Sequence, residues 1–215
     1  MAIAEQLIGN ARRTSSFISI VAGIGVGSGL FLNGRLYRGK NGFAGEIGHT
    51  TLIEGQNRPC RCNKRGCWEN SANLYSLIER VRARLEIGMR SSIPSLRSQN
   101  GSPLNLEVIL QAAEEDDAVA LEALHETGEA LGIGVANMIN IFNPEMVILG
   151  GTLSLAGKYL LPAMIEFTED RVLSDLKQRT QLALSAFGAD AGVMGAVALV
   201  MESILNEPLR VDKVN

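Results

Sequence analysis

The chain has 215 residues, of which 46% are hydrophobic and 20% charged, and its formal net charge is −3. This composition is typical of a globular protein with a substantial core in one large domain or two small ones. It excludes a disordered chain, and the net charge by itself gives no general attraction to nucleic acid or anionic membranes. Because no apolar run reaches transmembrane length and no signal sequence opens the chain, we expect a soluble cytoplasmic protein without a membrane partner.

The first elements are predicted to be a helix, a strand and a hairpin. Residues 1–9 resemble the end of a helix, because no capping residue precedes Ala2. Residues 17–22, FISIVA, are rich in β-branched side chains and predict a buried strand. Asn33 and Gly34, between LFL and RLY, predict a two-residue hairpin turn.

Between this strand and the hairpin, glycine occupies every second position, at Gly23, Gly25, Gly27 and Gly29. Glycines at this spacing leave one face of the backbone bare, which favours either the approach of a phosphate group or a tight bend between strands. The spacing differs from that of a dinucleotide-binding fold, and no helix follows it. Both interpretations stay open at this point.

Residues 45–69 contain all three cysteines of the chain and one of its two histidines. Three sulfurs and one imidazole are a complete tetrahedral set for zinc, so we expect a metal held by His49, Cys60, Cys62 and Cys67. Four protein ligands leave no open position for water, so this zinc would be structural. Asn63 and Gly66 are expected to supply the turns that bring the sulfurs together, because both residue types tolerate a positive φ.

The alternative for these residues is a group of reduced thiols that cluster by chance. A disulfide framework fits poorly, because the number of cysteines is odd and Cys60 and Cys62 are too close for easy pairing. Basic residues also surround the cysteines, and either a solvated loop or contact with a phosphate or an acidic partner would explain them. These residues are Arg58, Arg61, Lys64 and Arg65.

The rest of the chain predicts alternating helices and strands. Helices are expected at residues 71–87, 105–114, 117–141, 157–170 and 190–205, and strands at residues 146–151 and 182–187. The second half of the helix at 117–141 is apolar nearly all round, which places it in the centre of the fold, whereas His125 is expected at the surface. Residues 88–103 are polar and punctuated by proline and glycine, which favours a mobile loop.

Residues 23–69 resemble the ROK family of repressors, open reading frames and sugar kinases. The resemblance rests on GEIGH at residues 45–49, on C-x-C-x4-C-W-E at residues 60–69, and on the preceding GIGVGSGLFLNGRLYRGKNGFA. It implies an α/β fold of the actin-like ATPase and ribonuclease H-like type. Residues 1–215 would be its C-terminal large lobe, truncated at the amino end, and residues 45–69 its zinc- and sugar-binding loop.

The resemblance also implies roles for individual residues. Glu46, His49 and Glu69 match family positions that contact sugar hydroxyls, and His49 would also serve the zinc. This agrees with the chemistry of the side chains, because two carboxylates that accept hydroxyl donors make a clamp for a sugar. Ordinary surface charge is the alternative for both glutamates. One departure from the family is Asn63, where glycine is usual.

Four glycines match places where the family approaches a nucleotide. These are Gly25 and Gly27 after the first strand, and Gly150 and Gly151 at the end of the strand MVILGG, where the family binds adenine. A simple turn from strand to helix is the alternative for the last two. ATP and magnesium are expected only if the protein is a kinase.

The resemblance leaves three functions. The first is the sugar-sensing effector domain of a ROK repressor that binds a hexose or an N-acetylated hexosamine, forms a homodimer or larger homo-oligomer, and reaches DNA through a segment before Met1. The second is the large lobe of an ATP-dependent sugar kinase, whose catalytic aspartate would also precede Met1. The third is a zinc-stabilised oligomerisation domain with a relic pocket. A helix-turn-helix before Met1 would favour the first, and a phosphate-binding hairpin the second.

Overall fold

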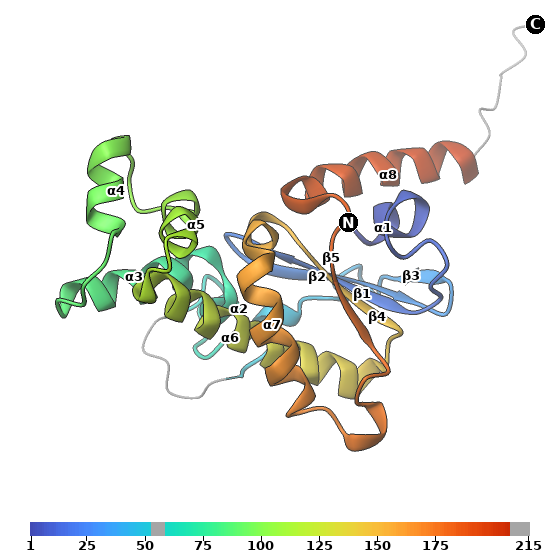
Figure 1. Ribbon diagram of the computed structural model, residues 1–215. Helices are drawn as coiled ribbons and strands as arrows, with labels where there is room; N and C mark the ends of the chain where they lie inside the picture. The colour runs from blue at the N-terminus through green and yellow to red at the C-terminus, as the bar shows by residue number, and fades with distance from the viewer. Residues whose placement is uncertain (53–58, 207–215) are drawn as a thin grey trace, which may run out of the picture.

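Five strands form one mixed sheet in the order β3-β2-β1-β4-β5 (Figure 1). The computed structural model describes residues 1–52 and 59–206. The strands are β1 (Phe17–Ala22), β2 (Val26–Leu32), β3 (Arg35–Tyr37), β4 (Met146–Gly150) and β5 (Gln181–Leu184). The first three pair antiparallel, whereas β4 and β5 continue the sheet in parallel. This arrangement confirms the predicted ribonuclease H-like sheet.

Helices cover both faces of this sheet (Figure 1). α1 and α8 lie on one face and α6 and α7 on the other, with α2 to α5 beside α6. Side chains of β1 alternate between the faces, since Ile18 and Ile20 join the core under α6, while Phe17 stacks on Phe31 beneath α1. The helices are α1 (Ala2–Ile8), α2 (Glu69–Ala72), α3 (Leu74–Glu86), α4 (Ile93–Asn100), α5 (Leu106–Glu114), α6 (Ala118–Phe142), α7 (Gly157–Glu169) and α8 (Ala191–Asn206).

The long helix α6 is central, as its apolar sequence predicts. Its first turn is capped by the Asp117 side chain, which accepts a hydrogen bond from the Ala120 N–H at 3.0 Å. Gly128 and Gly132 face α7 so closely that an added Cβ atom would lie 2.7 Å from a backbone carbonyl oxygen of that helix in both cases. These two glycines therefore allow α6 and α7 to pack backbone against backbone.

The prediction of a mobile loop at residues 88–103 is wrong, because α4 forms within it. Ile93 and Leu96 of this helix are buried, and the Ser92 N–H donates to the Asp117 carboxylate at 2.6 Å. Proline is tolerated in the first turn of a helix, where its missing N–H has no partner to lose, so Pro94 begins α4 where we expected it to prevent a helix.

The predicted helix at residues 71–87 is interrupted at Asn73. This residue has an extended backbone and caps α3, because its side chain accepts a hydrogen bond from the Ser76 N–H at 2.8 Å. The short helix α2 is therefore a separate element, and Glu69 is its first residue. The strand predicted at 182–187 is also displaced, to Gln181–Leu184.

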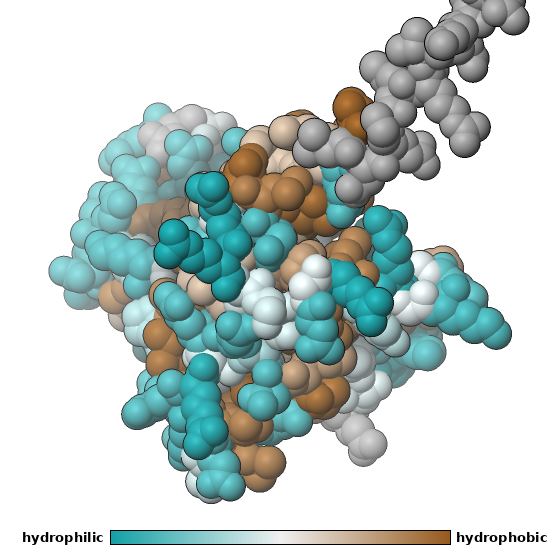
Figure 2. Space-filling view, turned by 90° about the vertical axis from the view of Figure 1, so that its right-hand side faces the viewer, coloured by the Kyte–Doolittle hydropathy of each residue, from teal (hydrophilic) through white to brown (hydrophobic). Residues whose placement is uncertain are grey.

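The outer face of α8 is apolar (Figure 2). Ala191 and Ala198 are buried, and the helix packs on α1, while most of its larger side chains stay exposed. The exposed ones are Val193, Val197, Leu199, Val200, Met201 and Ile204. Within the described residues, no helix is both long and apolar enough to cross a membrane.

We expect Gly134→Ala to destabilise the protein, although alanine is the better helix former by about 1 kcal/mol. A Cβ atom at this position would lie 2.0 Å from the Trp68 ring, so the free energy of unfolding should fall by about 1–3 kcal/mol from overpacking. Urea unfolding followed by the fluorescence of Trp68, the single tryptophan, measures the change.

Gly192→Ala in α8 is the matched control, because nothing lies within 4 Å of its added Cβ atom. It should leave stability unchanged or raise it slightly. Equal unfolding midpoints for the two variants would contradict the close contact between Trp68 and α6.

Candidate functional site

The loop that carries the cysteines is closed by backbone pairing. Thr51 pairs with Cys67 as an antiparallel bridge, and Pro59 pairs with Arg65. Asn63 has φ of 65°, which is the left-handed conformation. This confirms the prediction that asparagine can form the turn where glycine is usual. The turn at Asn63 folds Cys60 and Cys62 back toward Cys67.

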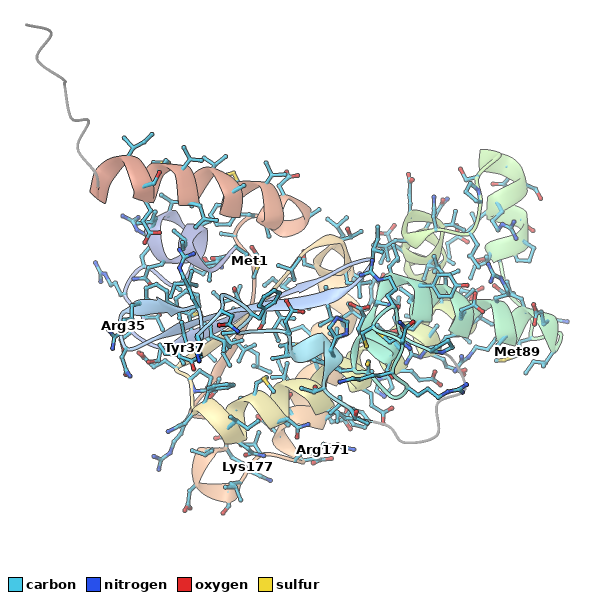
Figure 3. The ribbon with its side chains drawn as sticks, turned by 180° about the vertical axis from the view of Figure 1, so that it is seen from behind. Met1, Arg35, Tyr37, Met89, Arg171 and Lys177 are labelled. Atoms are coloured by element: carbon cyan, nitrogen blue, oxygen red, sulfur yellow. The ribbon has the colours of Figure 1, made fainter. Side chains whose placement is uncertain are left out.

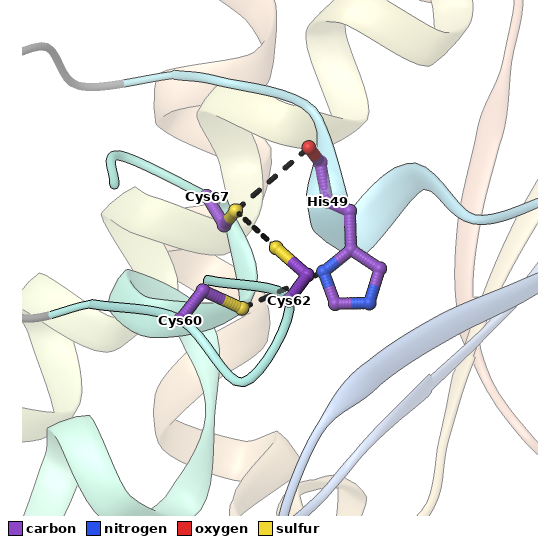
Figure 4. A group of neighbouring side chains, drawn as sticks. All are labelled: His49, Cys60, Cys62 and Cys67. Atoms are coloured by element: carbon purple, nitrogen blue, oxygen red, sulfur yellow. Dashed lines mark hydrogen bonds between the residues drawn. The ribbon is translucent and has the colours of Figure 1, made fainter. Parts of the chain in front are cut away.

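The four predicted metal ligands lie together (Figure 4). The Cys60 Sγ is 3.5 Å from the His49 Nδ1, the Cys62 Sγ is 3.5 Å from the Cys67 Sγ, and all four ligand atoms lie within 4.8 Å of one another. Sulfur atoms around a tetrahedral zinc ion with bonds of about 2.3 Å are roughly 3.8 Å apart. The donor set and its spacing therefore fit zinc.

The pKa values of Cys62 and Cys67 are shifted in opposite directions. Loss of hydration raises the pKa of the Cys67 thiol to about 12. A backbone hydrogen bond with Lys64 lowers the pKa of Cys62, which is less buried. A divalent cation would favour the thiolate form of these groups, so metal binding is expected to release protons.

The two ring nitrogens of His49 face different groups. Its Nδ1 faces the Cys60 sulfur, whereas its Nε2 lies 3.9 Å from the Glu46 carboxylate. The Glu46 side chain is 62% exposed, so its exposure alone does not separate a ligand-binding role from ordinary surface charge. The imidazole can thus bind the metal through Nδ1 and keep Nε2 for a ligand outside the cluster.

Glu69 is buried, which excludes ordinary surface charge for this residue. Its side chain is 6% exposed, and its Oε2 accepts a hydrogen bond from the Val26 N–H at 3.1 Å. Its Oε1 lies 3.8 Å from both the Cys60 Sγ and the Arg61 guanidinium. One carboxylate oxygen is therefore committed to the backbone, and the other faces the cluster.

The contacts of Glu69 explain one of the predicted glycines. A Cβ atom on Gly25 would lie 2.6 Å from the Glu69 Oε2, so the carboxylate needs glycine at that position. Gly27 differs, because nothing lies within 4 Å of its Cβ position, and it lines a hollow of about 360 Å³ on the face of the sheet. Of these two glycines, only Gly27 has room beside it for a ligand.

Gly150 and Gly151 are fully accounted for by packing. A Cβ atom on Gly150 would lie 3.0 Å from that of Ser185, and Gly151 has φ of +85° with its Cβ position 2.6 Å from the Ala22 carbonyl oxygen. These contacts agree with the alternative interpretation of the two glycines, a simple turn from strand to helix. A nucleotide at this pair remains a prediction.

Two functional supports escaped the sequence analysis. Trp68 is fully buried, and its Nε1 donates to the Ala130 carbonyl oxygen at 2.7 Å, which seats the loop on α6. Arg80 donates to the Ser71 carbonyl oxygen at 2.8 Å and to the Thr127 hydroxyl at 3.2 Å, which ties α2 to α6. The sequence could have revealed the role of Trp68, because a tryptophan next to Glu69 is a distinctive feature. It could not have revealed the role of Arg80, which resembles the other charged residues of α3.

The remaining predicted residues lie away from the cluster or at its edge. His125 is exposed and packs its ring edge against Phe167, as expected of a surface residue. Of the basic group, Arg61 is 77% exposed and reaches Glu69, Lys64 is exposed, and Arg58 lies outside the described residues. Arg61 is therefore not only a solvated charge, because its guanidinium also pairs with the buried Glu69 carboxyl group.

Fold and site together define the class of protein, an actin-like fold with a Cys/His cluster that could hold a metal ion. The chain belongs to the ROK family, because the model of that family matches residues 1–203. It is 35% identical to the xylose repressor of Caldicellulosiruptor bescii over 96% of this chain and 51% of that protein. The chain therefore spans about half the length of this relative.

Solved structures give the same result. A ROK family transcriptional regulator, a homologue of the E. coli MLC protein, superposes with a TM-score of 0.84 at 28% identity, over 94% of this chain and 50% of that one. A ROK glucokinase from Streptomyces griseus in complex with glucose and AMPPNP also gives 0.84, at 27% identity over 92% and 64%. Repressors and kinases of the family thus share this lobe.

We predict that protein purified without chelator carries about one zinc ion per chain. His49→Ala and Cys67→Ser should each lower the zinc content and destabilise the loop, because structural zinc contributes folding free energy. His125→Ala is the matched control and should leave the metal in place. Elemental analysis measures the content, and equal losses in both histidine variants would contradict the assignment.

The same cluster should make zinc affinity depend on pH. Thiol protons compete with the metal, so affinity should fall as pH falls, by about tenfold per pH unit for each thiol proton that binding releases. A competition titration against a chelator between about pH 6 and pH 8 tests the sign.

Proposed function

We propose that this chain is the sugar-sensing effector domain of a ROK transcriptional repressor. In this proposal residues 1–215 are the C-terminal large lobe, and residues 45–69 bind a hexose or an N-acetylated hexosamine. The supporting observation is Glu69, a buried carboxylate that touches both the Cys/His cluster and the glycine bend between β1 and β2. A carboxylic side chain is costly to bury, and buried ones with specific polar partners cluster at functional sites.

Sugar recognition in this proposal uses three side chains. Glu46 and Glu69 accept hydrogen bonds from sugar hydroxyls, and the His49 Nε2 supplies a third polar contact. The contacts run from Glu46 to His49, then to Cys60, and from Cys60 to Glu69. Zinc, when bound, fixes the loop and the histidine ring, and it contributes no hydrolytic chemistry.

The sugar loop of this proposal is hydrogen-bonded to β2 near both of its ends. The Val26 N–H donates to Glu69 at 3.1 Å, and the Ser28 N–H donates to the Gly45 carbonyl oxygen at 3.1 Å. A sugar hydroxyl that draws on Glu69 therefore acts on the glycine bend. We propose this link as the route by which sugar occupancy reaches the rest of a repressor.

The large lobe of an ATP-dependent sugar kinase is the second candidate. The glucokinase of the same fold with glucose and AMPPNP bound supports it, together with the open space beside Gly27. Under this proposal a nucleotide and magnesium would lie along the glycines after β1, and the catalytic aspartate would precede Met1.

We expect zinc-dependent sugar binding that is weak, with a dissociation constant in the millimolar range, or about −4 kcal/mol. Half of the pocket would be missing along with the closure that excludes water. Hexoses and N-acetylated hexosamines titrated by NMR should perturb residues 45–69. Glu46→Gln should weaken the perturbations, whereas Glu114→Gln, an exposed glutamate of α5, should not. Perturbations that map elsewhere or survive zinc removal would contradict the site.

We also expect no ATP-dependent phosphorylation of hexoses by the 215-residue chain. Loss of a general base alone lowers rates by about 10²–10⁴. A coupled assay measures turnover, with Glu69→Ala as the background. Turnover above that background would favour the kinase and place its general base within these residues.

A further inference from the structure

One end of the sheet carries five cations in a chain whose net charge is −3. The cations come from the loop after α1 and from β3 with the turn that follows it. All five side chains belong to exposed residues. We call this group the basic end, and it consists of Arg12, Arg13, Arg35, Arg38 and Lys40.

The backbone brings the two segments together. The Gly34 N–H donates to the Ser15 carbonyl oxygen at 2.8 Å, and the Asn33 N–H donates to the Ser16 hydroxyl at 3.1 Å. The turn after β3 is closed by the Ala44 N–H, which donates to the Arg38 carbonyl oxygen at 3.2 Å. Hydrogen bonds therefore hold the backbone from which the five side chains start, and Figure 3 labels Arg35 and Tyr37 on the edge strand β3.

The charges of the basic end are not neutralised by neighbouring acids. Among the described residues, no ion pair involves any of the five cations. The acid beside them, Glu145, accepts hydrogen bonds from Ser15 and Ser16, which lower its pKa and keep it charged. Glu145 offsets one charge, so an excess of about four remains within reach of one ligand surface.

The surface between these side chains is hollowed in two places. One shallow hollow is lined by Arg35, Arg38 and Lys40, with Tyr37 between them. A second is lined by Arg12 and Arg13. Tyr37 is 52% exposed, so an aromatic ring lies among the cations. Anionic groups can therefore enter between the basic side chains.

We propose that the basic end binds the phosphate backbone of duplex DNA, without reading its sequence. This proposal rests on the proposed function, because a repressor works on DNA. Four of the five cations are guanidinium groups, whose planar fork matches phosphate oxygens in a bidentate way. A duplex carries one charge per about 1.7 Å of axis, so a short stretch offers phosphates to all five.

Such contacts would add affinity and orientation to whatever reads the operator sequence. Each phosphate contact should steepen the dependence of log K on log salt concentration by about 0.9. Debye screening confines the repulsion from acids elsewhere on the chain to about 10 Å at 0.1 M salt. A negative net charge therefore does not prevent local binding.

The test is fluorescence anisotropy of a labelled 20-base-pair duplex of arbitrary sequence, titrated with the 215-residue chain between about 25 and 150 mM salt. Alanine at all five positions of the basic end should lower affinity at least tenfold and flatten the salt dependence. Changing the four arginines to lysine keeps the charge and should retain most of the affinity. Two double variants test the proposal even if the fivefold variant fails to fold. Each should lose part of the DNA affinity: Arg12→Ala with Arg13→Ala, and Arg35→Ala with Arg38→Ala.

The control variant removes five other exposed cations, at Arg90, Arg97, Lys158, Lys177 and Arg179, and so makes the same change in net charge. It should bind like the unchanged chain. An equal loss in this control, no binding by the unchanged chain at about 25 mM salt, or competition by polyglutamate as effective per charge as DNA would overturn the proposal. The last result would assign the surface to an acidic protein.

Sugar titration of the same preparation separates this proposal from the proposed function. If the chain binds sugar in a zinc-dependent way but does not bind DNA, only the proposal for the basic end is refuted. If the chain binds DNA, the fivefold variant loses that binding and no sugar binds, only the proposed sugar site is refuted.

Discussion

The indole of Trp68 fixes the position of the site, because its two neighbours in the chain are Cys67 and Glu69. The ring is fully buried against α6, where Gly134 leaves space for it and the Ala130 carbonyl oxygen accepts its N–H. A rigid aromatic anchor of this kind gains much apolar contact for little conformational entropy. Cys67 of the Cys/His cluster precedes it in the chain, and the buried carboxylate of Glu69 follows it and faces the cluster. One buried ring thus holds both neighbours in place.

The burial of Glu69 shows how the site surrounds a carboxyl group away from water. Such a group is costly to bury without polar partners, and a backbone N–H, the Arg61 guanidinium and the cluster surround this one. The N–H belongs to Val26 of β2, whereas Arg61 and the cluster belong to the cysteine loop. The carboxylate is therefore sensitive to the positions of the glycine bend and the cysteine loop, which is a useful property in a group that detects a ligand.

Much of the fold and the membership of the metal cluster could be predicted from the sequence, and the reasons are local. The close spacing of Cys60, Cys62 and Cys67 allows few arrangements of their sulfur atoms. The second half of α6 is apolar nearly all round, so it must be buried in the core. The errors have local causes too, since Pro94 begins a helix where we expected a loop and Asn73 caps one where we expected continuity. The seat of Trp68 on Gly134 joins residues distant in the chain, and no pattern in a single sequence reveals such a contact. The different burial of Glu46 and Glu69 was equally hidden, because both flank the same loop.

The glycine contact between α6 and α7 also limits how the lobe can change shape. With Gly128 and Gly132 against the carbonyl groups of α7, the two helices interlock, and sliding one past the other would drive backbone into backbone. The pair should therefore behave as a rigid block, and Trp68 fastens the cysteine loop to that block. A displacement that begins at the loop would instead pass to the sheet through β2, whose Val26 N–H donates to Glu69 and whose Ser28 N–H donates to the Gly45 carbonyl oxygen.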